Sequence, residues 1–177
     1  MSELLIVVDY QNDFVDGSLG FSGAEKLEDG ICRKIAAYRE RGGEVLFTLD
    51  THGKDYLATL EGKYLPVEHC IKGSDGWKLY GKVAEAVESG DTVIQKPSFG
   101  SAGLASYLKE RKYDSIELVG LVSNICVTAN AIIAKTFAPE AKVTVDASCT
   151  ASSDSDLNEK CLDVMAGMQI EIVNRRK

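Results

Sequence analysis

The sequence predicts a three-layer α/β/α fold, in which a Rossmann-like, mostly parallel six-stranded sheet carries helices on both faces. Two observations predict it. Six short apolar runs recur along the chain, and because they are nearly continuous rather than alternating, they are typical of strands buried on both faces. Helical patterns separate most of these runs, and such alternation favours parallel strands joined by right-handed crossovers.

Each element is justified by its local pattern. The β-branched apolar runs predict strands at residues 4–9, 44–50, 92–96, 115–120, 142–147 and 170–174. Helices are expected at residues 26–42, 80–90, 102–112, 126–138 and 153–168. The first of these ends at the pair Gly42-Gly43, the fourth stops before Pro139, and the last opens on capping residues.

Composition limits the classes of protein to which the chain belongs. Its 177 residues, 45% hydrophobic and 27% charged, predict one folded domain over residues 1–177. A net charge of −7 argues against nucleic acid as a partner. The first apolar run, "LLIVV", is interrupted at Asp9 and is too short to cross a membrane or form a secretory signal. We therefore expect a cytoplasmic protein with no membrane partner.

The five cysteines are scattered without Cys-x-x-Cys spacing. An odd number in a chain without a secretory signal indicates reduced thiols rather than a disulfide framework. Most of them are expected to be structural or incidental, since free cysteine is commonly buried. They are Cys32, Cys70, Cys126, Cys149 and Cys161.

One segment interrupts the alternation of strands and helices. Residues 51–79 contain no helical pattern of useful length, but they hold both histidines and the only tryptophan, Trp77. A long irregular segment within a compact domain is usually functional.

The ends of the predicted strands carry the residues best suited to chemistry. The first strand ends at Asp9, the second at Asp50, the third at Lys96, and the fourth runs into the turn before Cys126. Open parallel sheets bind ligands beyond the carboxyl ends of their strands. A lone aspartate at such a position is often only a helix cap, but these four groups together predict an active site.

Cys126 permits two interpretations, a small apolar filler or a nucleophile. In the second, the helix N-terminus and the ammonium of Lys96 would favour the thiolate, and backbone N–H groups of the turn would face a developing oxyanion. Asp9 would take the thiol proton and deliver it to a leaving amine. This chemistry requires no histidine.

The histidines indicate a different kind of site. Asp50 and His52 lie two residues apart on one side of an extended segment, and His69 follows, with Glu61 between them. Together they form a donor set suited to Zn²⁺, Mn²⁺ or Fe²⁺. Taken alone, two histidines and scattered carboxylates are more often surface residues than a metal site.

Three motifs carry a resemblance to a known family. "IVVDYQNDFV", "QKPSFGSAG" and "GLVSNICVTANAI" resemble the cysteine hydrolases of the isochorismatase-like superfamily. The segments "LDTHGKDY" and "YLPVEHCIKGSDGW" further resemble its nicotinamidase branch. The resemblance extends from residue 4 to about residue 146, with the motifs in the family's order.

The resemblance implies roles for individual residues. The family's catalytic aspartate, lysine and cysteine match Asp9, Lys96 and Cys126. Its metal ligands match Asp50, His52 and His69, and Glu61 is placed for the additional glutamate ligand of some members. The expected cofactor is a divalent metal ion, with Zn²⁺ favoured over Mn²⁺ or Fe²⁺.

The resemblance also implies features that composition does not reveal. These are a cis peptide between Leu121 and Val122, and an oxyanion site made by the backbone N–H groups of Val122 and Cys126. The aromatic rings that would hold a pyridine match Phe14 and Phe99. Two positions depart from the usual pattern: Leu65 stands where an aromatic residue is common, and Tyr56 where a third histidine is common.

The leading hypothesis is hydrolysis of nicotinamide to nicotinate and ammonia through a thioester on Cys126, which would serve NAD salvage. The alternative enzyme is a related cysteine hydrolase acting on another small amide, ureide or carbamoyl compound, without a working metal site. A hypothesis of a different class is an inactive relative that binds a small ligand or serves as an assembly subunit. The resemblance implies a small-molecule amide as partner and a homo-oligomer.

The charge state of Cys126 is a further expectation. The helix N-terminus and Lys96 favour the thiolate, whereas Asp9 disfavours it, and these opposing effects are similar in size. We therefore expect a thiol pKa modestly below that of free cysteine.

Overall fold

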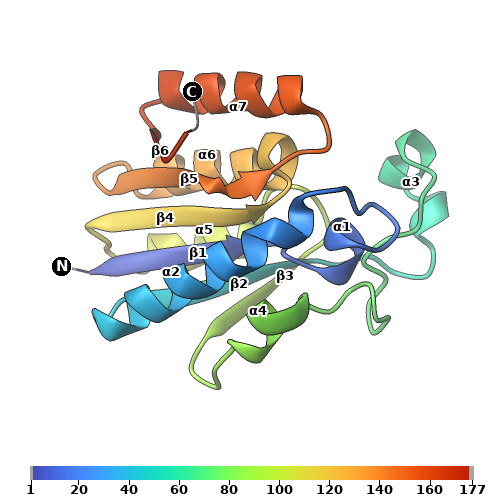
Figure 1. The fold of residues 1–177 in the computed structure, drawn as a ribbon, viewed down its shortest axis with the longest axis horizontal. Coiled ribbons are helices and arrows are strands. Elements are labelled where there is room, and N and C mark those ends of the chain that lie inside the picture. Colours follow the sequence, from blue (N-terminus) through green and yellow to red (C-terminus); the bar gives the residue numbers. More distant parts are fainter. Residues whose placement is uncertain (1, 176–177) are drawn as a thin grey trace.

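The sheet has the predicted strand number and direction. The computed structural model describes residues 2–175, and its six strands are all parallel, in the order β3-β2-β1-β4-β5-β6. The strands are β1 (Glu3–Val8), β2 (Glu44–Asp50), β3 (Thr92–Lys96), β4 (Ser115–Leu121), β5 (Lys142–Ala151) and β6 (Glu171–Val173). The predicted three-layer arrangement is confirmed (Figure 1).

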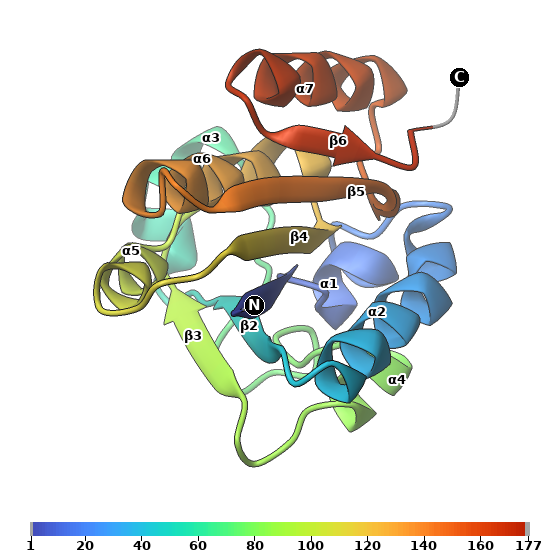
Figure 2. The same cartoon turned by 90° about the vertical axis from the view of Figure 1, so that its left-hand side faces the viewer.

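Helices cover both faces of the sheet (Figure 2). The first face packs against α5 (Ala102–Lys109), α6 (Thr128–Phe137) and α7 (Ser155–Gly167), and the second against α1 (Asn12–Val15), α2 (Glu28–Glu40) and α4 (Gly81–Glu85). Residues of β1 alternate between these two cores: Leu4, Ile6 and Val8 face the first, and Leu5 and Val7 the second. This double burial explains why β1 is a continuous apolar run. None of the helices in residues 2–175 is long and apolar enough to span a membrane.

Several predicted boundaries were wrong by a few residues. The helix expected over 80–90 covers only Gly81–Glu85, and the one expected over 26–42 divides into a 3₁₀ turn, Ala24–Leu27, and α2. Strand β5 continues to Ala151 rather than ending at Ala147, because its pairing with β4 shifts register between Leu118 and Gly120 and then resumes. The polar residues of this second half do not resemble a buried strand in the sequence.

The irregular segment before β3 contains only short helices. They are the 3₁₀ turn Tyr56–Ala58 and α3 (Leu60–Tyr64), and α3 lies with α1 beyond the sheet, at the end toward which the strands run (Figure 1). Cys126 lies in a π-helical turn, η3 (Ser123–Val127), which precedes α6. The helix predicted from Cys126 therefore begins regular α-helical geometry only at Thr128.

Candidate active site

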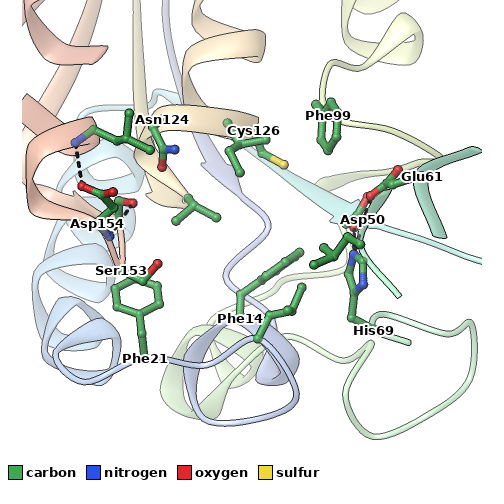
Figure 3. A pocket seen from close by; sticks show the side chains of 16 residues that line it. Phe14, Phe21, Asp50, Glu61, His69, Phe99, Asn124, Cys126, Ser153 and Asp154 are labelled. Carbon is green, nitrogen blue, oxygen red and sulfur yellow. Dashed lines mark hydrogen bonds and ion pairs between the residues drawn. The ribbon is translucent and has the colours of Figure 1, made fainter. Parts of the chain in front are cut away.

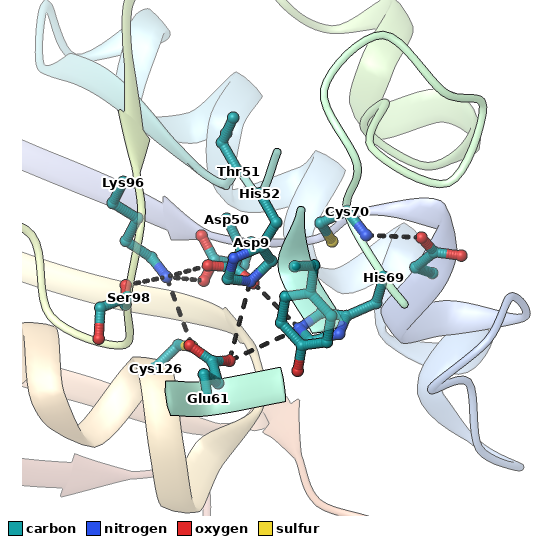
Figure 4. A network of polar contacts seen from close by, with 12 residues as sticks. Asp9, Asp50, Thr51, His52, Glu61, His69, Cys70, Lys96, Ser98 and Cys126 are labelled. Atoms are coloured by element: carbon teal, nitrogen blue, oxygen red, sulfur yellow. Dashed lines mark hydrogen bonds and ion pairs between the residues drawn. The ribbon is translucent and has the colours of Figure 1, made fainter. Parts of the chain in front are cut away.

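The four strand-end residues meet at one place. Because β3, β2, β1 and β4 are consecutive neighbours in the sheet, their carboxyl ends bring Lys96, Asp50, Asp9 and the turn holding Cys126 side by side (Figure 4). All four side chains are buried. The structure thus brings together every residue of the predicted catalytic triad.

Lys96 is the centre of this cluster. Its Nζ lies 2.6 Å from Asp9 Oδ2, 3.4 Å from Asp50 Oδ1 and 3.5 Å from Cys126 Sγ. It also donates to the carbonyl of Ser98 over 2.9 Å. Burial alone would lower the pKa of Lys96, but Asp9, Cys126 and Asp50 outweigh this and raise it above its ordinary value. Lys96 therefore stays charged.

Asp9 adopts an uncommon backbone conformation, with φ of 45°, at the end of β1. Thr48 Oγ1 donates to its Oδ1 over 2.6 Å, and its backbone N–H donates to the carbonyl of Thr48 over 3.2 Å. Burial raises the pKa of Asp9, and Lys96 opposes that rise. A carboxyl group with a raised pKa suits proton transfer near neutral pH. Sequence reasoning missed Thr48, although a polar residue inside the apolar run "VLFTL" was visible.

The expected charge state of Cys126 was wrong. Burial raises the pKa of its thiol well above the ordinary value, the carboxylate of Asp9 raises it further, and Lys96 only partly compensates. Removing a thiolate from water costs more free energy than the nearby charges return, so the neutral thiol is favoured. Cys126 rests as a thiol, and it could act as a nucleophile only if a neighbouring base removed its proton.

The turn around Cys126 is held by its own backbone and by one asparagine. The Val122 carbonyl accepts from the N–H groups of Ile125 and Val127, over 3.1 Å and 3.2 Å. The implied cis peptide between Leu121 and Val122 is present. Asn130 Nδ2 donates to the carbonyl of Cys126 over 2.8 Å, a contact that the sequence did not reveal.

The predicted metal ligands also converge, next to the catalytic cluster. Asp50, His52 and His69 each place a ligand atom within 4.8 Å of the others. Asp50 Oδ2 lies 3.0 Å from His52 Nε2 and 3.4 Å from His69 Nε2, and Glu61 Oε1 lies 3.8 Å from both imidazole nitrogens. His69 Nδ1 is 2.8 Å from the carbonyl of Val67, so it carries the proton and leaves Nε2 as a free acceptor. Three converging acceptor atoms, with a carboxylate oxygen of Glu61 beside the two imidazoles, fit a divalent cation.

Residues around these ligands fix their orientation. The side-chain amide of Gln11 donates to the carbonyl of Asp50 over 2.9 Å and accepts from its N–H over 2.8 Å. Tyr56, which stands where a third histidine was considered, packs its ring 4.7 Å from that of His52 and 4.9 Å from that of His69. Its hydroxyl donates to the carbonyl of Leu65, so Tyr56 supports the site rather than facing the ligand atoms.

A cavity of about 280 Å³ connects the two clusters. Figure 3 shows Phe14 and Phe99 on opposite sides of it, with Cys126 beside them and Asp50, Glu61 and His69 at one end. Leu65, which stands where the family commonly has an aromatic residue, also lines the cavity. The neighbouring aromatic residue, Tyr64, is exposed instead. Three carboxylates line the cavity, but no lysine or arginine of the described residues does.

This arrangement fits a hydrolase: a buried cysteine, aspartate and lysine adjoin a cluster of residues that could hold a metal ion, on a doubly wound α/β sheet. The chain belongs to the isochorismatase-domain family, which matches residues 3–176. It is an enzyme that hydrolyses amide bonds and is nicotinamidase-like.

Individual relatives agree with this assignment. An uncharacterised isochorismatase family protein of Bacillus subtilis is 30% identical over 144 residues, covering 75% of this chain and 78% of that protein. The nicotinamidase/pyrazinamidase of Mycobacterium tuberculosis is 27% identical over 186 residues, covering 96% and 97%. The pyrazinamidase of Pyrococcus horikoshii, solved in complex with zinc, has the same fold with a TM-score of 0.86, at 22% identity over 99% of this chain and all of that one.

Proposed function

We propose that this enzyme hydrolyses nicotinamide to nicotinate and ammonia, through a thioester on Cys126. The observation that carries the proposal is the contact of Lys96 with Asp9, Asp50 and Cys126, which joins a nucleophile and its base to a cluster of metal ligands across one cavity. The product would feed the biosynthesis of pyridine nucleotides.

The residues can carry each proton transfer. Asp9 takes the proton of Cys126 as Sγ bonds to the amide carbon, and the carbonyl electrons move to oxygen. When this adduct collapses, the C–N bond breaks and Asp9 gives its proton to the departing nitrogen, which leaves as ammonia. Water then adds to the thioester with Asp9 as base, the C–S bond breaks, and Cys126 recovers its proton. The positive charge of Lys96 holds Asp9 in place and stabilises negative charge on the sulfur of Cys126.

The backbone N–H groups of Val122 and Cys126 are proposed as donors to the oxyanion of each adduct. Val122 directly precedes η3 and Cys126 lies within it, and the shape of this turn is maintained by the two hydrogen bonds to the Val122 carbonyl. Donors that are fixed before the reaction stabilise a developing charge without reorganising.

Asp50, His52, His69 and Glu61 are proposed to hold a divalent metal ion. Two imidazoles with carboxylates favour Zn²⁺, and the same donors also suit Mn²⁺ or Fe²⁺. Such an ion would supply a Lewis acid for the ring nitrogen of a pyridine substrate. Phe14 is buried 5.7 Å from the ring of His69, centroid to centroid, which places an aromatic surface where that pyridine would lie, with Phe99 opposite.

The lining of the cavity favours a neutral amide over an anionic one. No lysine or arginine of the described residues lines it. An anionic carbamoyl compound would lack the bidentate cationic partner that carboxylates commonly require. A neutral amide such as nicotinamide needs no such partner.

Ammonia release from nicotinamide by the zinc-loaded enzyme tests the proposal, with Cys126→Ala as the control. The same assay with pyrazinamide and with an anionic carbamoyl amino acid ranks the substrate classes. Absence of turnover, or turnover that Cys126→Ala leaves unchanged, would refute the proposed function.

A further inference from the structure

The carboxylate of Asp9 is held on its two sides by different kinds of contact. Thr48 Oγ1 donates to Oδ1 over 2.6 Å, whereas Lys96 Nζ lies 2.6 Å from Oδ2. Thr48 thus holds one oxygen by a hydrogen bond, and the ammonium of Lys96 holds the other by a charged contact. Each oxygen of an ionised carboxylate has two lone pairs, so the group held in this way can still accept a proton.

The hydroxyl of Thr48 is well suited to hold Oδ1. Thr48 is fully buried in β2, where it pairs with Val8 of β1, and its β-branched side chain has restricted rotation. An ionised carboxylate can only accept, so Thr48 is the donor. Thr48 is not among the cavity-lining residues of the described chain, so it does not touch a substrate there.

We propose that Thr48 is a positioning residue that fixes the carboxylate of Asp9 for proton transfer. The proton of Cys126 passes to this carboxylate as sulfur attacks, and the carboxylate returns it to the departing nitrogen. The bond from Thr48 to Oδ1 stops the carboxylate from rotating away between these steps. The inference rests on the proposed roles of Asp9 and Cys126, but not on nicotinamide being the substrate.

Removal of the Thr48 hydroxyl should change the pKa of Asp9 in a predictable direction. The groups that face Asp9 are Lys96 from β3, Asp50 from β2 and Cys126 from η3, and all remain in a Thr48→Val variant. Burial and Asp50 raise the pKa of Asp9, while Lys96 and the Thr48 hydrogen bond lower it. Without Thr48 that pKa rises further. Because Asp9 accepts the thiol proton only when ionised, reactivity at Cys126 is then lost at a higher pH.

The test is the rate at which iodoacetamide alkylates Cys126 of the zinc-loaded enzyme, measured against pH and located by peptide mass spectrometry. In Thr48→Val, which keeps the shape of the side chain, the midpoint of the acid limb should rise by about one pH unit. Thr48→Ser restores the hydroxyl and should keep the midpoint of the wild type. Thr150→Val is the matched control, because Thr150 is another buried threonine of the sheet, and its Oγ1 has no partner in residues 2–175.

Two outcomes would overturn the inference. The first is an unchanged midpoint in Thr48→Val with only a lower melting temperature, which would make Thr48 a structural residue; Thr48→Ala repeats the measurement should the valine variant not fold. The second is an Asp9→Asn variant with the wild-type profile, which would overturn the role of Asp9 as well. For an amide that the wild type hydrolyses, Thr48→Val should lower kcat and leave KM unchanged. Failure to hydrolyse nicotinamide would refute only the proposed substrate, since alkylation does not depend on it.

Discussion

At the scale of single residues, the charge state of Cys126 is set by burial and by two neighbours with opposite effects. Asp9 raises the pKa of the thiol and Lys96 lowers it, while burial raises it more than either. The thiol therefore remains protonated at neutral pH, so the proposed role of Cys126 as nucleophile requires the transfer of its proton to Asp9.

Substitution of these two neighbours should move the thiol pKa in opposite directions. Lys96→Ala removes the stabilising cation and should raise the pKa of Cys126, whereas Asp9→Asn removes the repelling anion and should lower it. Both should reduce turnover by at least about a hundredfold, the first through the charge on sulfur and the second through loss of the proton carrier. Alkylation rates against pH measure the shifts, and a shift of the same sign in both variants would contradict the assigned roles.

At the scale of elements, short irregular segments complete the site that the strands begin. Helix α3 has only the residues Leu60–Tyr64, and its N-cap Thr59 accepts from the N–H of Gly62 over 3.0 Å. This cap fixes the turn that presents Glu61 to the two histidines. A helix this short is not stable by itself, so its contacts with the 3₁₀ turn before it hold it in place.

The contribution of Glu61, which α3 carries, to the proposed metal site can be measured through the affinity of the protein for zinc. Glu61→Gln replaces an anionic donor by a neutral one, and zinc binding measured by calorimetry should weaken by roughly tenfold or more. Glu68→Gln is the matched control, because Glu68 adjoins His69 in the sequence but is exposed. Equal affinity in both variants would show that Glu61 is not a ligand.

The end of β4 depends on one glycine. Gly120 has φ of 110°, and a Cβ at this position would lie 2.0 Å from the carbonyl oxygen of Val8 in the neighbouring strand. Gly120→Ala should lower the free energy of unfolding by about 3 kcal/mol or more. In Gly167→Ala the new Cβ meets no atom within 4 Å, so chemical denaturation should show that variant to be no less stable than the wild type.

At the scale of the whole molecule, a partly buried ion cluster joins elements on the side of the sheet away from α5 and α6. Lys34 of α2 lies 2.5 Å from Glu117 of β4 and 2.6 Å from Asp146 of β5. Asn174, which follows β6, donates to Asp146 over 2.8 Å. The cluster therefore connects α2, β4, β5 and the segment after β6, which are distant in the sequence.

The cluster predicts how stability depends on pH. Burial alone would raise the pKa of Asp146, but hydrogen bonds from Lys34, Ser148 and Asn174 lower it below its ordinary value. A carboxyl group with a lowered pKa stabilises the fold above its unfolded pKa, near 4, and this contribution is lost as the pH falls through the folded pKa. The Asp146→Asn variant should thus be less stable than the wild type at pH 7. Its free energy of unfolding should also fall less than that of the wild type as the pH is lowered. Urea denaturation from pH 7 to pH 3 measures both effects, and an unchanged slope would contradict the prediction.

The sequence predicted the sheet, and it also predicted which residues would meet in the proposed triad and metal site. Apolar runs identify buried strands, and although one polar residue at a strand end is often a helix cap, several at the ends of neighbouring strands are brought together by the sheet. Thr48 and Asn130 were missed because their roles depend on neighbours that only the register of β1 with β2 and the packing of α6 provide. The predicted pKa of Cys126 was wrong for a related reason, since the cost of desolvating the thiolate depends on the packing of the whole site.

Asp50 has a consequence for any attempt to separate the two halves of the site by experiment. One oxygen of its carboxylate faces Lys96 and the other faces the histidines. A chelator would withdraw an ion but leave the carboxylate beside Lys96, whereas Asp50→Asn would take the charge from both places. The two treatments are therefore not interchangeable: chelation isolates what the ion provides, and any greater loss in Asp50→Asn measures what the carboxylate contributes through its contact with Lys96.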